Sequence, residues 1–431
     1  MTAEIAIMNK LAVALAADSA VTFGGSEGQG EKIYNTANKL FALSHHYPVG
    51  IMLYGDAQFT GVPWESVVKT YRKQLGHKSF GTLDEYAEHF IAFLDRRNPL
   101  FPRQAQEQGL LGSVASYYTE PIRRDIEKAI QDKITNRGKA TEDDVKEVVR
   151  RTLKTHNDKL QRLNRLPGMP SGHERRIRQR YKKTIDFARQ HVFGKLPLSA
   201  YDVRLLNNIA ALLYTKELFP SNCSGIVIAG FGERETFPSV VQIKAQGVLL
   251  DRLKQKEERR TAIGLDVQAA IVPFAQTEMV ATFMEGIDPF YSRAIGSSLG
   301  ELVKRLCECF AETLDRVPKK SKDACVRKLQ QATPQLVEEF LNRLNADKRK
   351  RYIDPVISTV GVLPKDELAA MAESLVNLTS FKRRVSMTPE TVGGPIDVAV
   401  ISKGDGFIWI KQKHYFKPEL NRHFFAIRGF S

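Results

Sequence analysis

The second residue of the chain is a threonine, a residue type that can act as a nucleophile when it begins a polypeptide. Methionine is commonly removed before a small second residue, and its removal would leave Thr2 with both a hydroxyl and a free α-amine. A hydroxyl is a poor nucleophile at neutral pH, but an α-amine with a pKa of about 7.7–8.0 can take up its proton through a water molecule. Thr2 could therefore hydrolyse amides through a threonyl ester.

Two charged residues stand where they could assist this hydroxyl. Asp18 follows Thr2 in the segment 17–22 (ADSAVT), and Lys39 precedes an apolar run. We expect Asp18 to end one buried strand and Lys39 to start another, so that both side chains reach the edge where Thr2 lies. The carboxylate would orient the ammonium, which would lower the pKa of the amine and of the hydroxyl. Taken singly, Asp18 could instead cap a turn, and Lys39 could be a solvated strand end.

Apolar runs beside these residues predict the strands that would position them. Residues 3–8 (AEIAIM) and 11–16 (LAVALA) flank a turn at Asn9 and Lys10, which indicates a largely buried hairpin. Residues 40–43 (LFAL) and 50–54 (GIMLY) indicate a second hairpin.

Helical and strand patterns continue along the rest of the chain. Helices are predicted at 64–68, at 83–94 and across 290–378, with charged bridges at 317–322 and 347–351. Further strands are predicted at 225–231, 240–243, 269–272, 396–401 and 407–411. Strands at both ends with helices between them indicate an α+β layered fold that pairs distant strands.

The order of these features resembles the N-terminal half of proteasome β-subunits and of bacterial proteasome-like peptidases, members of the N-terminal nucleophile (Ntn) hydrolases. The resemblance rests on Thr2, the segment ADSAVT, Lys39 and the glycine of Tyr54-Gly55-Asp56-Ala57. It implies that Thr2 is the nucleophile, that Asp18 and Lys39 are its charge partners, and that the Gly55 amide forms the oxyanion hole. Thr22 would bind the substrate main chain as a strand. Leu53, near Gly55, would line an apolar side-chain pocket.

Two later segments resemble the same family. Residues 293–298 (RAIGSS) map Ser297 beside the nucleophile, although a Gly-Ser pair that opens a helix is otherwise an ordinary N-cap. The helix at 364–378, Gly393-Gly394 and the last hairpin resemble the closing part of the family's fold. The family's aspartate and serine before Gly-Gly have no clear counterpart in Thr388–Val392, where Glu390 or Thr391 could take their place.

The resemblance implies a four-layer αββα Ntn sandwich that carries a large basic helical insertion. The expected segments are two core parts at 1–94 and 220–305, the insertion at 95–219, a second helical insertion at 306–360 and the closing core part at 361–431. The implied activity is that of a threonine peptidase on peptides or unfolded proteins, without a metal or other cofactor. The implied partners are further copies of the chain in a homo-oligomer and an ATP-dependent unfoldase.

The charge of the chain points to a further partner. The 431 residues include 64 Lys and Arg against 49 Asp and Glu, a net charge of +15. Residues 151–200 hold 13 basic residues against 3 acidic ones, which favours a polyanion such as nucleic acid, or an acidic protein. The same pattern also fits a solvated helical face. The alternative function is therefore an inactive proteasome-like scaffold whose basic insertion binds nucleic acid or an acidic partner.

Composition narrows the class of protein. At 42% hydrophobic and 26% charged residues the chain is expected to fold, which excludes a disordered or fibrous protein. The four cysteines form no CxxC pair, so we expect neither a disulfide framework nor a zinc knuckle, and a reducing, cytoplasmic environment fits. No apolar run reaches the roughly 18–20 residues of a membrane span, and we expect no membrane partner.

Overall fold

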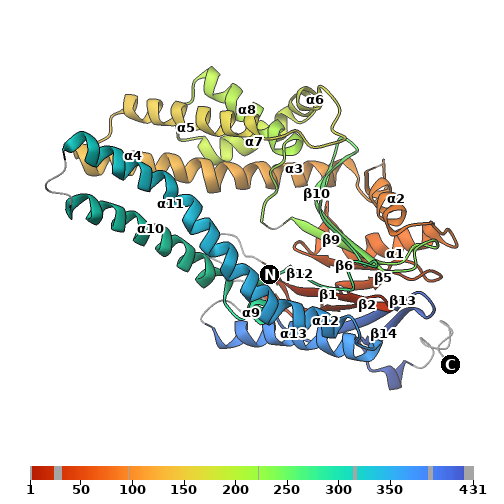
Figure 1. Cartoon of the computed structure of the whole chain (residues 1–431). Helices are drawn as coiled ribbons and strands as arrows, with labels where there is room; N and C mark the ends of the chain where they lie inside the picture. Colours follow the sequence, from red (N-terminus) through yellow and green to blue (C-terminus); the bar gives the residue numbers. More distant parts are fainter. Residues whose placement is uncertain are drawn as a thin grey trace. The chain divides into compact units, whose positions relative to one another are not determined.

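The computed structural model describes residues 2–23, 32–95, 97–221, 223–313, 318–386 and 392–421. The protein is a mixed α+β protein with antiparallel sheets (Figure 1). The chain divides into two compact units. Unit 1 comprises Met1–Leu40, Thr236–Pro238 and Ala262–Ser431, and unit 2 comprises Phe41–Glu235 and Ser239–Thr261. The stacking of two sheets into four layers, and the finer division into five segments, stay predictions.

Unit 1 contains a five-stranded antiparallel sheet with the order β12-β1-β2-β13-β14. Its strands are β1 (Ala3–Asn9), β2 (Ala12–Ala17), β12 (Ala269–Ala275), β13 (Asp397–Ser402) and β14 (Gly406–Lys411). The first and last hairpins predicted from the sequence are therefore confirmed, and β13 pairs directly with β2. A separate two-stranded sheet joins β3 (Val21–Phe23) and β4 (Lys32–Tyr34).

Helix α13 (Lys365–Val385) runs along the sheet and packs against small side chains on one of its faces (Figure 1). Ala12, Ala14 and Ala16 of β2 share an apolar core with Leu368 and Ala372 of α13. Because strand residues alternate between faces, the other face of β1 carries Glu4, Ala6 and Met8. The side chain of Thr2, which precedes β1, belongs to that second face by the same alternation.

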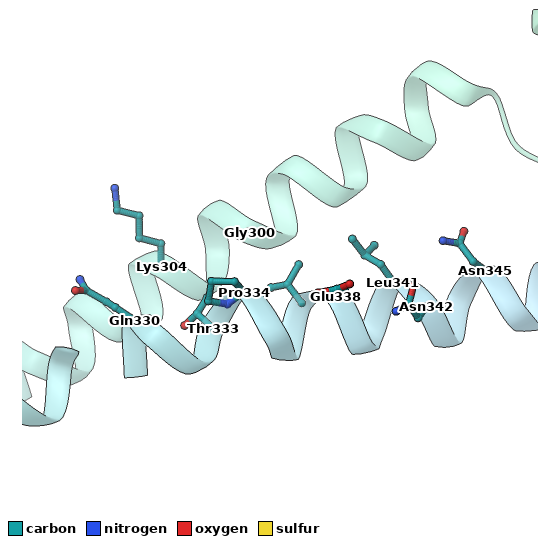
Figure 2. Close-up of a pocket in the computed structure, with 10 residues that line it drawn as sticks. Gly300, Lys304, Gln330, Thr333, Pro334, Glu338, Leu341, Asn342 and Asn345 are labelled. Atoms are coloured by element: carbon teal, nitrogen blue, oxygen red, sulfur yellow. The ribbon is translucent and has the colours of Figure 1, made fainter. Parts of the chain in front are cut away.

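Further helical elements of unit 1, long and short, lie between β12 and α13. They are α9 (Glu278–Glu285), α10 (Pro289–Thr313), α11 (Lys319–Lys348), the π-helical turn η2 (Arg349–Ile353) and α12 (Asp354–Val360). A cavity of about 870 Å³ lies between α10 and α11, with Gly300 on one helix and Leu341 on the other (Figure 2).

Both charged bridges predicted between these helices are corrected. In the described part of the first bridge, α11 already begins at Lys319, and the second bridge lies within α11 and η2. The charged side chains at the second bridge form ion pairs along the helix. Arg351 Nε lies 2.8 Å from Asp347 Oδ1, and Arg349 Nε lies 3.2 Å from Asp354 Oδ1. Such pairs are compatible with a continuous helix, so the charged run does not interrupt it.

Unit 2 is built on a second five-stranded sheet with the order β11-β10-β9-β6-β5. Its strands are β5 (Leu40–Ala42), β6 (Val49–Tyr54), β9 (Ser224–Gly230), β10 (Ser239–Leu249) and β11 (Arg252–Ala262). A short hairpin joins β7 (Gln58–Phe59) and β8 (Val62–Pro63). Helices α1 (Trp64–Leu75) and α2 (Leu83–Asp95) share an apolar core with this sheet.

A second apolar core in unit 2 belongs to the helices that follow. These are α3 (Arg103–Tyr117), the π-helical turn η1 (Tyr118–Arg123), α4 (Arg124–Arg137), α5 (Glu142–Arg162), α6 (His173–Arg180), α7 (Lys182–Phe193) and α8 (Ala200–Thr215). Capping boxes at Thr141 and Ser199 fix the starts of α5 and α8. Among the described residues, no helix combines the length and the apolar character that a membrane span requires.

Candidate active site

Thr2 is buried at the edge of the unit 1 sheet, where only 4% of its surface is exposed. Its carbonyl accepts a hydrogen bond from the Gln276 amide at 3.2 Å, immediately after β12. The next residue, Ala3, starts β1 and pairs with Ala275. The main chain around Thr2 is thus tied to the sheet, and its hydroxyl has a defined position.

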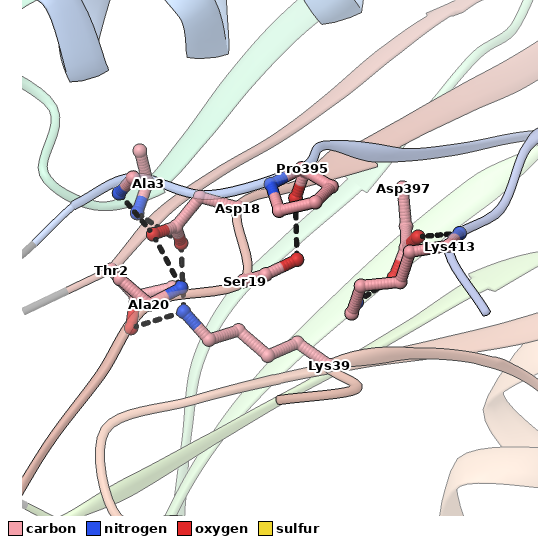
Figure 3. A network of polar contacts seen from close by, with 10 residues as sticks. Thr2, Ala3, Asp18, Ser19, Ala20, Lys39, Pro395, Asp397 and Lys413 are labelled. Carbon is pink, nitrogen blue, oxygen red and sulfur yellow. Dashed lines mark hydrogen bonds and ion pairs between the residues drawn. The ribbon is translucent and has the colours of Figure 1, made fainter. Parts of the chain in front are cut away.

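The structure brings the side chains of Asp18 and Lys39 to this hydroxyl (Figure 3). The Lys39 ammonium donates to Thr2 Oγ1 at 3.2 Å and to Asp18 Oδ1 at 2.7 Å. Lys39 is 5% exposed and Asp18 is 1% exposed. A buried ion pair therefore lies within hydrogen-bond distance of the threonine hydroxyl, and water screens its charges little.

Asp18 is held by backbone amides as well as by the lysine. Oδ1 also accepts from the Ala3 amide at 3.1 Å, and Oδ2 accepts from the amides of Ala20 at 3.2 Å and Gly393 at 3.0 Å. These bonds satisfy both carboxylate oxygens and fix the direction in which Asp18 presents its charge to Lys39. Asp18 does close a turn after β2, and it holds Lys39 at the same time.

The Gly393-Gly394 segment completes this arrangement. The Gly393 carbonyl accepts from the Ser19 amide at 3.1 Å, and the Ser19 hydroxyl donates to the Pro395 carbonyl (Figure 3). Gly394 has a φ of +76°, and a Cβ there would lie 2.7 Å from the Cβ of Asn35. Only glycine fits this backbone and this close approach without strain. The glycine pair noted in the sequence thus brings an amide to Asp18.

Glu4 is a residue of the site that the sequence reasoning missed. Both of its carboxyl oxygens are buried, and neither has a hydrogen-bond partner in the part of the chain that the structure describes. Burial raises the pKa of Glu4 to about 8; the nearby Lys39 ammonium lowers it, and the Asp18 carboxylate raises it further. The signal was present, since Glu4 is the single charged residue in the strand AEIAIMN.

Asp397 provides a contrast on the same face of the sheet. In the register of the strands, Glu4 and Asp397 both lie opposite Ala17 of β2. Asp397 is also buried, but it forms an ion pair with Lys413 and accepts from the Lys413 amide at 2.9 Å (Figure 3). A buried carboxyl in this sheet can therefore have its own cation, whereas no cation among the described residues is bonded to Glu4.

The remaining predicted site residues are not joined to Thr2 by a hydrogen bond among the described residues. Gly55 and Leu53 belong to unit 2: Gly55 follows β6 with a φ of +86°, and Leu53 is buried in the core of the sheet. Their roles as oxyanion donor and pocket residue stay predictions. Thr22 pairs with Ile33 in the β3–β4 sheet, so one edge of its strand is already occupied.

Ser297 was expected at the start of a helix, but it does not lie there. It lies inside α10, which begins eight residues earlier at Pro289, and it is exposed. The N-cap reading is therefore wrong, because Pro289 rather than Gly296 opens the helix, and proline is favoured in the first turn. Glu390 and Thr391, considered as substitutes for the family's acidic residue and serine, lie outside the described residues.

The site combines groups that could take part in acid–base and nucleophilic chemistry. A hydroxyl, an ammonium and a carboxylate form one buried chain of hydrogen bonds, and a second carboxyl without a partner lies near them. Comparison of the chain with models of known protein families and with curated proteins found no match.

Proposed function

We propose that the protein is a threonine-type N-terminal nucleophile hydrolase that cleaves amide bonds in peptides or unfolded proteins. The observation that supports the proposal most is the position of the buried Lys39 ammonium, 3.2 Å from Thr2 Oγ1 and 2.7 Å from Asp18. A lysine that only stabilised the fold would need one buried partner. This lysine donates to the one hydroxyl that the removal of Met1 would place on a free N-terminus.

The proposed reaction has two stages. Thr2 Oγ attacks the substrate carbonyl while its proton passes through water to the Thr2 α-amine, and a tetrahedral oxyanion forms. The amine then returns the proton to the leaving nitrogen, the C–N bond breaks, and an ester remains on Thr2. A water molecule, activated by the same amine, hydrolyses the ester and restores the hydroxyl.

Lys39 contributes through its charge. As the hydroxyl loses its proton, negative charge develops on Thr2 Oγ, and an ammonium at hydrogen-bond distance stabilises it in a buried environment. Asp18 keeps the ammonium in place because the carboxylate is itself held by three amides. The Gly55 amide is the proposed donor to the oxyanion of the substrate.

The first experiment is mass spectrometry of the purified N-terminus, followed by labelling with a threonine-directed electrophile. We expect Met1 to be absent and Thr2 to be labelled, whereas Thr2→Ala abolishes labelling and peptide hydrolysis. Thr2→Ser is the matched control, since it keeps a hydroxyl and should retain measurable labelling. Retained Met1, or full turnover by Thr2→Ala, contradicts the mechanism.

The four-layer Ntn sandwich, the homo-oligomer and an ATP-dependent unfoldase as partner belong to the same proposal, and they rest on the resemblance in sequence. Light scattering of the purified full chain tests the oligomer. A mass that corresponds to a single chain at micromolar concentration contradicts it.

A second candidate function is an inactive scaffold that binds a polyanion or an acidic partner through residues 151–200. It is favoured by the exposure of most basic side chains in this segment, among them Arg151, Lys154, Lys159 and Arg162. Retention of Met1 together with salt-sensitive binding of nucleic acid would support this function over hydrolysis.

A further inference from the structure

A cavity of about 480 Å³ in unit 2 gathers three arginines. Arg103 comes from the first turn of α3, and Arg176 and Arg180 come from α6. The turn between β10 and β11 adds Asp251 to the lining. Three guanidinium groups against one carboxylate leave an excess of positive charge in one hollow.

The arginines around this cavity lack carboxylate partners. Within the described residues, neither Arg103 nor Arg180 forms an ion pair. Arg176 Nη2 lies within hydrogen-bond distance of His173 Nδ1, at 3.3 Å. Asp251 accepts a hydrogen bond from Gln106 Nε2 at 3.3 Å. Three guanidinium groups that line one cavity with a single carboxylate repel one another, and a bound anion would relieve this repulsion.

The start of α3 adds to the positive field. Pro102 is the N-cap and provides no side-chain cap, and the first turn holds no acidic residue. Arg103 therefore places a positive charge at the positive end of the helix dipole, where acidic residues are normally favoured. The positive end of this helix dipole would therefore favour an anion in the cavity, as the arginines do.

The framework of the cavity is well fixed. Gln106 is buried and also donates to the Phe101 carbonyl at 3.0 Å, and Tyr181 is buried beside it in the lining. Leu250 and Asp251 both have left-handed backbones, with φ values of 52° and 57°. Residues other than glycine adopt this conformation at a cost, which is commonly found where a turn shapes a functional site.

We propose that this cavity binds a small ligand with two or more linked phosphate groups, such as pyrophosphate or the phosphate chain of a nucleotide. Guanidinium groups bind phosphate oxygens in pairs, and the three arginines offer several such pairs. The volume lies in the range of small-molecule sites. The arginines converge on one hollow, which suits a compact anion better than an extended nucleic-acid strand. This inference does not depend on the threonine site.

The test is isothermal titration calorimetry of the full chain with pyrophosphate at about 50 mM and about 150 mM NaCl. We expect saturable binding that weakens at the higher salt. Arg180→Ala should weaken the affinity about tenfold or more, and Arg180→Lys should recover only part of it, because lysine keeps the charge and loses the paired donors.

The double substitution Lys182→Ala with Lys183→Ala is the control, because these exposed lysines of α7 adjoin the cavity in sequence but do not line it. We expect the control to bind pyrophosphate as the unmodified chain does. Two results overturn the proposal: no binding of pyrophosphate at the lower salt, or an equal loss in the control and in Arg180→Ala. Because Arg180 is exposed, Arg180→Ala is expected to keep its thermal unfolding profile, which verifies that the variant is folded.

Discussion

Two buried carboxyls on one face of the unit 1 sheet differ in their partners. Asp397 has the Lys413 ammonium, whereas both Glu4 oxygens lack a partner. A buried carboxylate without a bonded cation is costly, and protonation is the simplest way to avoid that cost. Near neutral pH, Glu4 therefore adds a neutral acid beside Lys39 and Asp18 rather than a second negative charge.

Replacing Glu4 by glutamine should change how stability depends on pH. The pKa of Glu4 is about 8 in the folded protein against 4.5 ordinarily, so between these values the folded state keeps a proton that the unfolded state has lost. The free energy of unfolding should therefore fall as pH rises through this window, by about 1.4 kcal/mol per pH unit. Glu4→Gln removes this contribution and should flatten the curve.

Urea denaturation between about pH 5 and pH 8 measures this slope. Glu301→Gln, at an exposed position on α10, is the control and should leave the slope unchanged. An identical slope in the unmodified chain and in Glu4→Gln would show that Glu4 does not hold a proton in the folded state.

Lys254 of β11 is a buried lysine that joins several elements of unit 2 by hydrogen bonds. Lys39 does the same in unit 1, where it bonds Thr2 and Asp18. Its ammonium donates to the carbonyls of Leu213 in α8 and of Leu218, and to Gln246 Oε1 of β10 at 2.7 Å. Burial lowers the pKa of Lys254 to about 7. One buried side chain thus fastens the end of α8 to the sheet.

Lys254→Met should remove a stability contribution that depends on pH. Between about pH 7 and pH 10 the unfolded state keeps a proton that the folded state has lost. As pH rises through this range, the free energy of unfolding of the unmodified chain should therefore increase, relative to that of the variant, by up to about 1.4 kcal/mol per pH unit. The readout is urea denaturation at both ends of this range. Lys256→Met, which removes an exposed ion pair with Glu217, should show no such trend, and a similar trend in both variants refutes the assignment.

Gly394→Ala tests whether the loop before β13 positions Asp18. The added Cβ would meet Asn35, and the left-handed backbone disfavours alanine, so we expect a loss of about 1–3 kcal/mol of stability. We also expect slower labelling of Thr2, because the Gly393 amide would move away from Asp18. Gly404→Ala, where nothing lies within 4 Å, is the control. Equal labelling rates in the two variants contradict a role for the loop.

The sequence predicted those elements whose hydrophobic pattern matched their burial. β1, β2 and β9 are buried on both faces and read as continuous apolar runs. β11 was missed because seven of the eleven residues in its sequence, RLKQKEERRTA, are charged, and it forms a largely exposed edge strand. Charge on an edge protects against pairing with other chains, a requirement of the surface that hydrophobic periodicity does not reveal.

The candidate site was predictable in part for a similar reason. Thr2 and Asp18 lie at the ends of β1 and β2, which the pattern identified and which pair with each other, so the closeness of these two residues followed from that pairing. Lys39 precedes β5, which pairs with neither of these strands, so its hydrogen bonds to Thr2 and Asp18 did not follow from strand pairing. The part played by Gly393 was not derivable from spacing alone, because its amide reaches Asp18 across 375 residues of sequence. Likewise, no local pattern distinguishes Glu4 with its unpartnered oxygens from Asp397 with its lysine.

The net charge of +15 is a property of the whole molecule and should govern its binding to polyanions. We expect binding of single-stranded RNA to weaken steeply as NaCl rises from about 50 to 200 mM, because each neutralised phosphate releases a counterion. Charge reversal by Lys154→Glu with Lys159→Glu on α5 should weaken binding and reduce the salt slope. The same change of net charge by Lys320→Glu with Lys328→Glu on α11 is the control. Equal effects of the two pairs would assign binding to overall charge and not to residues 151–200.

The pairing of β2 with β13 has a consequence for the timing of activity. The ribosome releases Thr2 and Asp18 early, whereas the glycine that bonds Asp18 follows it by 375 residues, and β13, which pairs with β2, comes later still. A growing chain cannot assemble the threonine centre until Gly393 and β13 have been made. Under the proposed function, neighbouring nascent polypeptides are thereby protected from cleavage while synthesis is under way.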